Sequence, residues 1–269
     1  MEQVVEKVEM MNTDLGPLAV TQHGHDGPWV LLWHSLFVDG RSWDAVLPAL
    51  TARHRVLVVD GPCHGRSPGP DRRFSLDDCA KAALAVLDHK GASQADWIGN
   101  AWGGHVGIAL AATAPQRLRS VAAICSPMQA LRTSERLKFL AMAAIFRLSG
   151  WTDALANKIA GVLILETANA DARRYVLEAI RAPGAARSRR AMKSVMFGRP
   201  SLLDRLPRIE IPTLFVTTDG NLLWPQPIAE EHAHLVRNCR VVALEGSRHL
   251  PPLEIPDQMS TLLTSWLNA

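Results

Sequence analysis

Residues 97–104, WIGNAWGG, decide how this chain folds, because they read as the end of a strand, a tight turn and the start of a helix. Residues 96–98 predict a short buried strand, and residues 102–113, rich in Gly and Ala, predict a helix that can lie close to a sheet. Gly99 and Gly103 bracket the turn, and we expect it to be so tight that larger side chains there would clash and that the backbone of Ala101 at its centre is strained. A G-x-A-x-G string alone is usually an ordinary strand–helix turn, so its meaning depends on the surrounding segments.

Strand-like and helix-like segments alternate on both sides of this turn. Short apolar runs predict further buried strands at residues 29–33, 55–59, 120–125, 213–217 and 240–244. Helical patterns appear at residues 75–87, 226–236 and 257–266, and Ser75 is the expected N-cap of the first. This alternation is typical of an α/β protein whose mostly parallel central sheet is flanked by helices on both faces.

One region, residues 128–200, breaks the alternation, because it holds no convincing strand. Its helical stretches, 134–148, 152–163 and 170–180, predict a helical cap inserted into a core that residues 1–127 and 201–269 form. We expect most large apolar side chains of the cap to pack together and a few to line a pocket. They are Phe139, Met142, Ile145, Phe146, Trp151, Met192, Met196 and Phe197. The basic run Arg187, Arg189, Arg190 and Lys193 is either a solvated helix face or a docking site for a substrate carboxylate.

The composition is that of an ordinary globular protein, with 269 residues, of which 48% are apolar and 20% charged. A net charge of +3 is too small to argue for nucleic acid or a membrane surface as a partner. No stretch reaches the roughly 18 apolar residues of a membrane span. Residues 1–12 lack the apolar centre of a signal peptide.

The cysteines and glycines argue against bound cofactors. Cys63, Cys79, Cys125 and Cys239 have no CxxC spacing, which disfavours a disulfide framework or zinc site and favours the cytoplasm. There is no phosphate-binding glycine loop and no cluster of metal-ligand residues. We therefore expect no cofactor, no metal and a small-molecule substrate, while the oligomeric state is not indicated.

Three more segments show which kind of protein contains a turn like this one. His34, Ser35, Leu36 and Phe37, followed by Gly40 and Trp43, come after a predicted strand; residues 60–67 read DGPCHGRS; residues 246–249 read GSRH. With the turn, these resemble the HGxxxxxxxW, D-x-P-G-x-G-x-S, G-x-S-x-G and G-x-x-H segments of the α/β-hydrolase fold superfamily, in that order. Ser35 and Cys63 each replace a family glycine.

This resemblance implies a role for each matching position. Ala101 occupies the place of the nucleophilic serine, and His249 is the expected general base. The backbone N–H groups of Leu36 and Trp102 are the expected oxyanion hole, in which one donor is worth roughly 3 kcal/mol of barrier. His34 is expected to brace the first loop. The family activity so implied is hydrolysis of a carboxylic ester or lactone.

The acid of the triad is less clearly marked. It is expected after strand 213–217, where an ungapped match to G-x-x-D-x-x-x-P puts Asn221 at the acid position. We predict Asp219 instead, since it is the only acid in that loop, although it can equally be a turn former before Gly220.

The substrate is expected to be hydrophobic and uncharged, because the cap is apolar and tryptophans flank the site. Phe37, Met128, Phe146 and Trp224 are the predicted contacts, with core packing as the alternative for Trp102 and Trp224. Cys125 and Ser126 can line the pocket or lie in the core. Cys63 is a weak candidate for a substitute nucleophile, since no base is evident beside it.

Three hypotheses explain Ala101. We predict the first: the chain is an inactivated form of an ester or lactone hydrolase in which alanine replaces a serine. The alternatives are that the alanine is natural and the protein binds ligands, or that the fold performs lyase or cofactor-free oxygenase chemistry with His249 alone. Restoring serine tests the first, and substituting His249 separates the other two.

Overall fold

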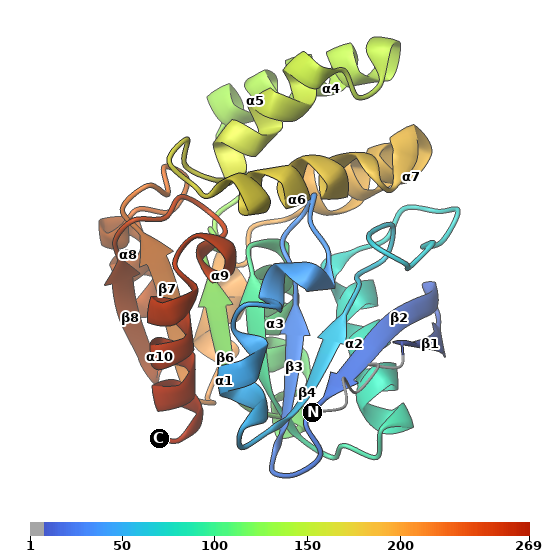
Figure 1. Cartoon of the computed structure of the whole chain (residues 1–269). Coiled ribbons are helices and arrows are strands. Elements are labelled where there is room, and N and C mark those ends of the chain that lie inside the picture. Colours follow the sequence, from blue (N-terminus) through green and yellow to red (C-terminus); the bar gives the residue numbers. More distant parts are fainter. Residues whose placement is uncertain (1–7) are drawn as a thin grey trace.

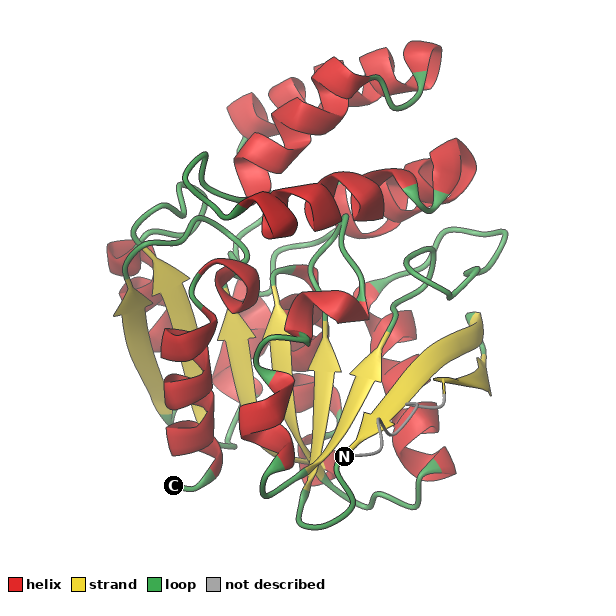
Figure 2. Cartoon of the chain, viewed as in Figure 1, coloured by secondary structure: helices red, strands yellow, loops and turns green. Residues whose placement is uncertain are grey.

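The computed structural model describes residues 8–269, which form an eight-stranded sheet flanked by helices (Figures 1 and 2). The strand order is β1-β2-β4-β3-β5-β6-β7-β8. The strands are β1 (Val8–Thr13), β2 (Gly16–His23), β3 (Trp29–Trp33), β4 (Arg55–Val59), β5 (Ala95–Asn100), β6 (Leu118–Ile124), β7 (Thr213–Thr218) and β8 (Cys239–Leu244). The six predicted strands are confirmed to within two residues at either end.

One strand, β2, runs opposite to the other seven. β1 pairs antiparallel with β2, and β2 pairs antiparallel with β4, while every pairing from β4 to β8 is parallel. The sequence did not predict β1 and β2, because their mixed polar and apolar residues lack the continuous apolar runs of the parallel strands.

Helices cover both faces of the sheet and enclose separate apolar cores. One face carries α2 (Leu76–His89), α3 (Trp102–Thr113) and α8 (Gln226–Ala233), and the other carries α1 (Leu47–Thr51) and α10 (Pro256–Leu267). The predicted N-cap of α2 is confirmed, since the Ser75 hydroxyl accepts the Asp78 N–H while the Asp78 carboxylate accepts the Ser75 N–H. The short helix α9 (Pro251–Glu254) follows β8.

Four helices lie between β6 and β7, beyond the carboxyl ends of the strands (Figure 1). They are α4 (Thr133–Ser149), α5 (Asp153–Leu163), α6 (Ala170–Arg181) and α7 (Gly184–Ala191), which runs into a π-helical turn, Met192–Met196. These helices share an apolar cluster with Phe37 and Val38 of the loop after β3. The helices occupy the predicted insertion, and their treatment as a separate cap domain stays a prediction. Within residues 8–269, no helix combines the length and apolarity needed to cross a membrane.

The topology brings two loops together at the centre of the sheet. β3 lies between β4 and β5, with Trp33 in register with Gly99. The chain therefore leaves β3 toward one side of the sheet and returns to β5 on the other. Ligand sites of open α/β sheets form where the strand order reverses in this way, outside the carboxyl ends of the strands.

Candidate active site

The turn after β5 has the strained geometry that the sequence predicted. Ala101 has φ 50° and ψ −106°, a left-handed conformation that side-chain-bearing residues rarely adopt. A Cβ on Gly99 would lie 2.2 Å from the Gly103 carbonyl, and one on Gly103 would lie 2.0 Å from the Trp33 oxygen. The two glycines thus let the start of α3 pack against β3 and β5, which forces residue 101 to the tip of the bend.

Ala101 and His249 line the same cavity, whose volume is about 120 Å3. The walls come from the loop after β3, the start of α3 and the cap. They are Ser35, Leu36, Phe37, Ala101, Trp102, His105, Pro127, Leu131, Phe139, Val162, Leu163, Val195, Met196, Arg199, Leu223 and His249. The tip of the bend therefore opens on a pocket that the imidazole also reaches.

Two backbone N–H groups on this cavity have no acceptor within the described part of the chain. Trp102 is the first residue of α3, so its N–H has no partner inside the helix. The Leu36 N–H likewise makes no recorded hydrogen bond, whereas the neighbouring Phe37 N–H donates to His64 Nε2 at 3.3 Å. Leu36 and Trp102 thus offer the unpaired donors that an oxyanion hole requires.

Two buried imidazoles hold the loop that carries Leu36. His34 Nε2 accepts the Gly61 N–H at 2.8 Å and its Nδ1 donates to the Ser35 carbonyl, while the Nδ1 of His64 donates to the Pro62 carbonyl. Each ring therefore carries its proton on Nδ1 and is neutral. Burial favours this form, since it lowers the pKa of His34 and lowers that of His64 to about 3. The bracing role expected of His34 agrees with these contacts.

Three contacts fix the backbone around His249. Asn100 Nδ2 donates to the His249 carbonyl at 3.1 Å, and the His249 N–H donates to the Leu163 carbonyl at 3.1 Å. The Glu254 carboxylate accepts the Arg248 N–H at 2.9 Å. Burial lowers the pKa of His249 to about 4, so the imidazole is neutral at physiological pH and can accept a proton.

Neither candidate acid contacts the His249 ring. Asp219 is exposed, and its carboxylate accepts the N–H groups of Gly220 and Gly246, so it shapes the turn instead. Asn221 is buried, and its Oδ1 accepts the Leu223 and Trp224 N–H groups at 3.2 Å. Across residues 8–269, no carboxylate hydrogen-bonds the His249 ring, so this geometry does not support Asp219 in that role, and the identity of the triad acid stays a prediction.

The structure places two of the four predicted substrate contacts on cavities and the other two in the apolar core. Phe37 lines the cavity. Phe146 lines a smaller inner cavity of the cap that Phe37 also borders. Met128 and Trp224 are fully buried in the apolar core, where Trp224 donates from Nε1 to His232 at 3.0 Å. Their apolar bulk marked them for the site, but bulk alone does not separate core from pocket.

Sequence reasoning missed two polar residues of the cavity. His105 lies one helical turn after Ala101, and both its Nε2 and Arg199 Nη1 are 2.9 Å from the Pro127 carbonyl. Arg199 takes part in no ion pair within residues 8–269; burial lowers its pKa to about 10, although the charge of Glu135 acts to raise it. A cation on the cavity is at odds with the expected uncharged substrate. The four-residue spacing from Ala101 could have revealed His105, whereas no local signal marks Arg199.

The cysteines and Ser126 lie outside the cavity. Cys63 and Cys125 are fully buried, and burial raises the pKa of the Cys125 thiol to about 12, which keeps it protonated. Ser126 donates to the Ile124 carbonyl. No described group of three or more His, Cys, Asp or Glu side chains is arranged to hold a metal ion.

Comparison with known proteins agrees with the fold. The model of the alpha/beta hydrolase family matches residues 30–261. The chain therefore belongs to the alpha/beta hydrolase family.

Several curated relatives match nearly the whole chain. RutD of Pseudomonas savastanoi pv. phaseolicola (strain 1448A / Race 6), named for carbamate hydrolysis, is 30% identical over 268 residues, covering 92% of this chain and 96% of that protein. The magnesium-chelatase 30 kDa subunit of Rhodobacter capsulatus is 28% identical, covering 90% and 87%. By contrast, the chain spans only 28% of the Pseudomonas putida dihydrolipoyllysine-residue acetyltransferase component of the acetoin cleaving system, at 37% identity over 38% of its own length.

Solved structures share the fold at low identity. An esterase of Thermogutta terrifontis has a TM-score of 0.87 at 23% identity, covering 97% of this chain and 98% of its own. The enol-lactonase of Burkholderia xenovorans LB400 has a TM-score of 0.85 at 20% identity, covering 98% and 100%.

Proposed function

We propose that the cavity at Ala101 binds a small carboxylic ester or lactone, with its carbonyl oxygen on the N–H groups of Leu36 and Trp102. One observation carries this proposal: the strained Ala101, His249 and two unpaired backbone donors border one cavity. The esterase and lactonase names among the structural relatives agree with a carbonyl substrate.

A serine at position 101 would make this arrangement an acyl-transfer site. His249 would take the hydroxyl proton as the serine oxygen attacks the carbonyl carbon, and the two N–H groups would hold the oxyanion. The C–O bond to the alcohol would then break, and the alcohol would leave with that proton. Water, deprotonated by His249, would release the acid. The methyl group of Ala101 has no electron pair to donate, so this chain holds the ester without forming an acyl-enzyme.

The missing acid limits what serine alone can restore. Loss of the triad acid costs serine hydrolases about 10⁴-fold in kcat, because nothing then stabilises the imidazolium. Since no carboxylate among residues 8–269 bonds the His249 ring, Ala101→Ser should acylate with an activated ester and turn over slowly. The combined lack of nucleophile and acid favours a natural ligand-binding protein over a chain altered at one position.

The test is stopped-flow measurement of p-nitrophenol release from p-nitrophenyl acetate by Ala101→Ser. We expect a burst that approaches one equivalent per chain, followed by slow release. The unsubstituted chain and the double variant Ala101→Ser/His249→Gln are the matched controls and should give no burst. A folded Ala101→Ser variant without a burst would contradict the proposal.

A second candidate function is chemistry by His249 without a covalent intermediate. It is favoured by the His249 imidazole on the cavity, which is neutral and has no hydrogen-bond partner in the described part of the chain. His249→Gln in the chain with Ala101 separates the two functions. A binding protein keeps its ester ligand and has no turnover to lose, whereas a serine-free enzyme loses its reaction.

A further inference from the structure

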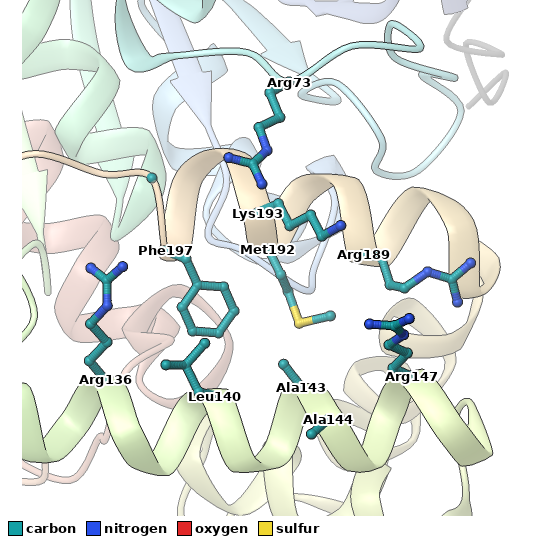
Figure 3. A pocket seen from close by; sticks show the side chains of 11 residues that line it. Arg73, Arg136, Leu140, Ala143, Ala144, Arg147, Arg189, Met192, Lys193 and Phe197 are labelled. Carbon is teal, nitrogen blue, oxygen red and sulfur yellow. The ribbon is translucent and has the colours of Figure 1, made fainter.

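A basic groove lies on the cap, on the far side of the inner cavity from Ala101. It has a volume of about 860 Å3 and runs between α4 and the segment of α7 and its π-helical turn (Figure 3). Its cations come from three parts of the chain and face one another across the groove. They are Arg73, Arg136, Arg147, Arg189 and Lys193.

These cations lack the partners that other arginines of the chain have. Arg190, beside Arg189, pairs with Asp71, and Arg205 pairs with Asp77. Within residues 8–269, no ion pair involves any of the five groove cations, and no acidic residue lines the groove. Like charges gathered without counter-charge repel one another, and an anion bound among them removes that repulsion.

The groove has an apolar wall as well as charge. Leu140, Ala143, Met192 and Phe197 line it between the cations (Figure 3). A purely ionic surface for inorganic anions needs no such wall, whereas an amphiphilic ligand buries its hydrocarbon part there. Met192 also suits variable apolar ligands, because its side chain is flexible.

The apolar wall continues inward to the candidate active site. Ala143 and Met192 border both the groove and the inner cavity of the cap. Phe37, Phe139 and Met196 border both that inner cavity and the cavity at Ala101. The inner cavity is only about 10 Å3, so its side chains must move apart to admit a hydrocarbon chain.

We propose that the groove binds the phosphate head of a soluble phosphate ester whose apolar chain points inward toward Ala101. Several arginines around one site match the oxygens of a phosphate by bidentate hydrogen bonds. The volume lies in the range of small-molecule sites. Binding of the phosphate in the groove does not depend on catalysis. That the ligand's apolar part reaches the ester site rests on the proposed function.

The experiment is calorimetric titration of the unsubstituted chain with octyl phosphate below its micellar concentration. We expect binding that weakens from 50 to 500 mM salt and is at least about tenfold tighter than that of octanol or inorganic phosphate. Arg147→Glu/Arg189→Glu should weaken it by about a hundredfold, since each lost charged hydrogen bond is worth about tenfold. Arg73→Gln/Arg136→Gln should also weaken the binding of octyl phosphate.

Lys138→Glu is the matched control, because Lys138 is exposed on α4 and does not line the groove. It should leave the affinity unchanged. Equal affinity of the double variants and the unsubstituted chain would overturn the proposal. Binding to phosphatidylglycerol vesicles without binding to octyl phosphate would overturn it too, because the partner would then be a lipid surface. Neither outcome bears on the burst of Ala101→Ser, so the two proposals fail separately.

Discussion

Replacing Glu254 by alanine should loosen the segment that presents His249. The carboxylate of this half-buried residue accepts the Leu165 N–H at 2.7 Å, the Ser247 hydroxyl at 2.7 Å and the Arg248 N–H at 2.9 Å, and it accepts the Leu250 N–H at a longer 3.4 Å. It thus ties the end of α5 to the loop before His249. No other described side chain makes these three contacts.

The magnitude follows from the three shorter hydrogen bonds, since the one to Leu250 at 3.4 Å is weak. Each bond to a charged group contributes about 1.5–3 kcal/mol, but the three share one carboxylate and water can replace part of them. We therefore expect Glu254→Ala to lower the free energy of unfolding by about 3 kcal/mol. Glu254→Gln keeps an acceptor oxygen and loses the charge, so it should lower the free energy by about half as much.

Urea unfolding followed by tryptophan fluorescence measures this loss, and ester binding measures the effect on the site. The exposed Glu245 is the matched control, and its change to alanine should shift the unfolding free energy by less than about 0.5 kcal/mol. A loss below 1 kcal/mol in Glu254→Ala, with ester affinity unchanged, would refute the idea that Glu254 positions His249.

Two further predictions concern the elbow and the buried imidazoles. Gly99→Ala should lower the free energy of unfolding by about 3 kcal/mol or more in thermal or urea unfolding, because its Cβ would lie 2.2 Å from the Gly103 backbone. Gly161→Ala is the control: it lies in α5 with no atom within 4 Å of the new Cβ, and it should raise the free energy of unfolding by about 0.5–1 kcal/mol. A similar loss of stability in the two variants would contradict this prediction. The pKa values of His64 (about 3) and His249 (about 4) lie below the unfolded value near 6.5, so between these pH values the unfolded chain binds more protons than the folded chain. The stabilisation from these neutral rings should therefore be fully present above about pH 6.5, and the free energy of unfolding should fall as the pH drops below it. Urea midpoints that stay level from about pH 7 to 5 would show that these rings are solvated.

The sequence predicted the parts of the fold that local pattern determines. Continuous apolar runs marked the parallel strands, and Gly99 and Gly103 marked the elbow because only glycine allows the close approach of β3, β5 and α3. The mixed polarity of β1 and β2 carried no such signal, and the short, arginine-rich α7 was marked only by its basic run, for which a helix face was one of two interpretations.

The site was only partly predictable, for a physical reason. Four site residues follow strand ends closely in the sequence, so the order of motifs along the chain was enough to locate them. They are Leu36, Ala101, Trp102 and His249. The direction of a loop side chain is set by contacts distant in sequence. The Asp219 carboxylate therefore accepts the Gly246 N–H, and Arg199 lines the cavity although no pattern in its own segment predicted this.

The most direct test of this account is a crystal structure of the unsubstituted chain with an uncleaved ester, such as p-nitrophenyl acetate, in the cavity. The account predicts that the carbonyl oxygen lies about 3 Å from the nitrogens of both Leu36 and Trp102, with the carbonyl carbon facing the Ala101 methyl group. An ester bound with its carbonyl turned away from both nitrogens would contradict it.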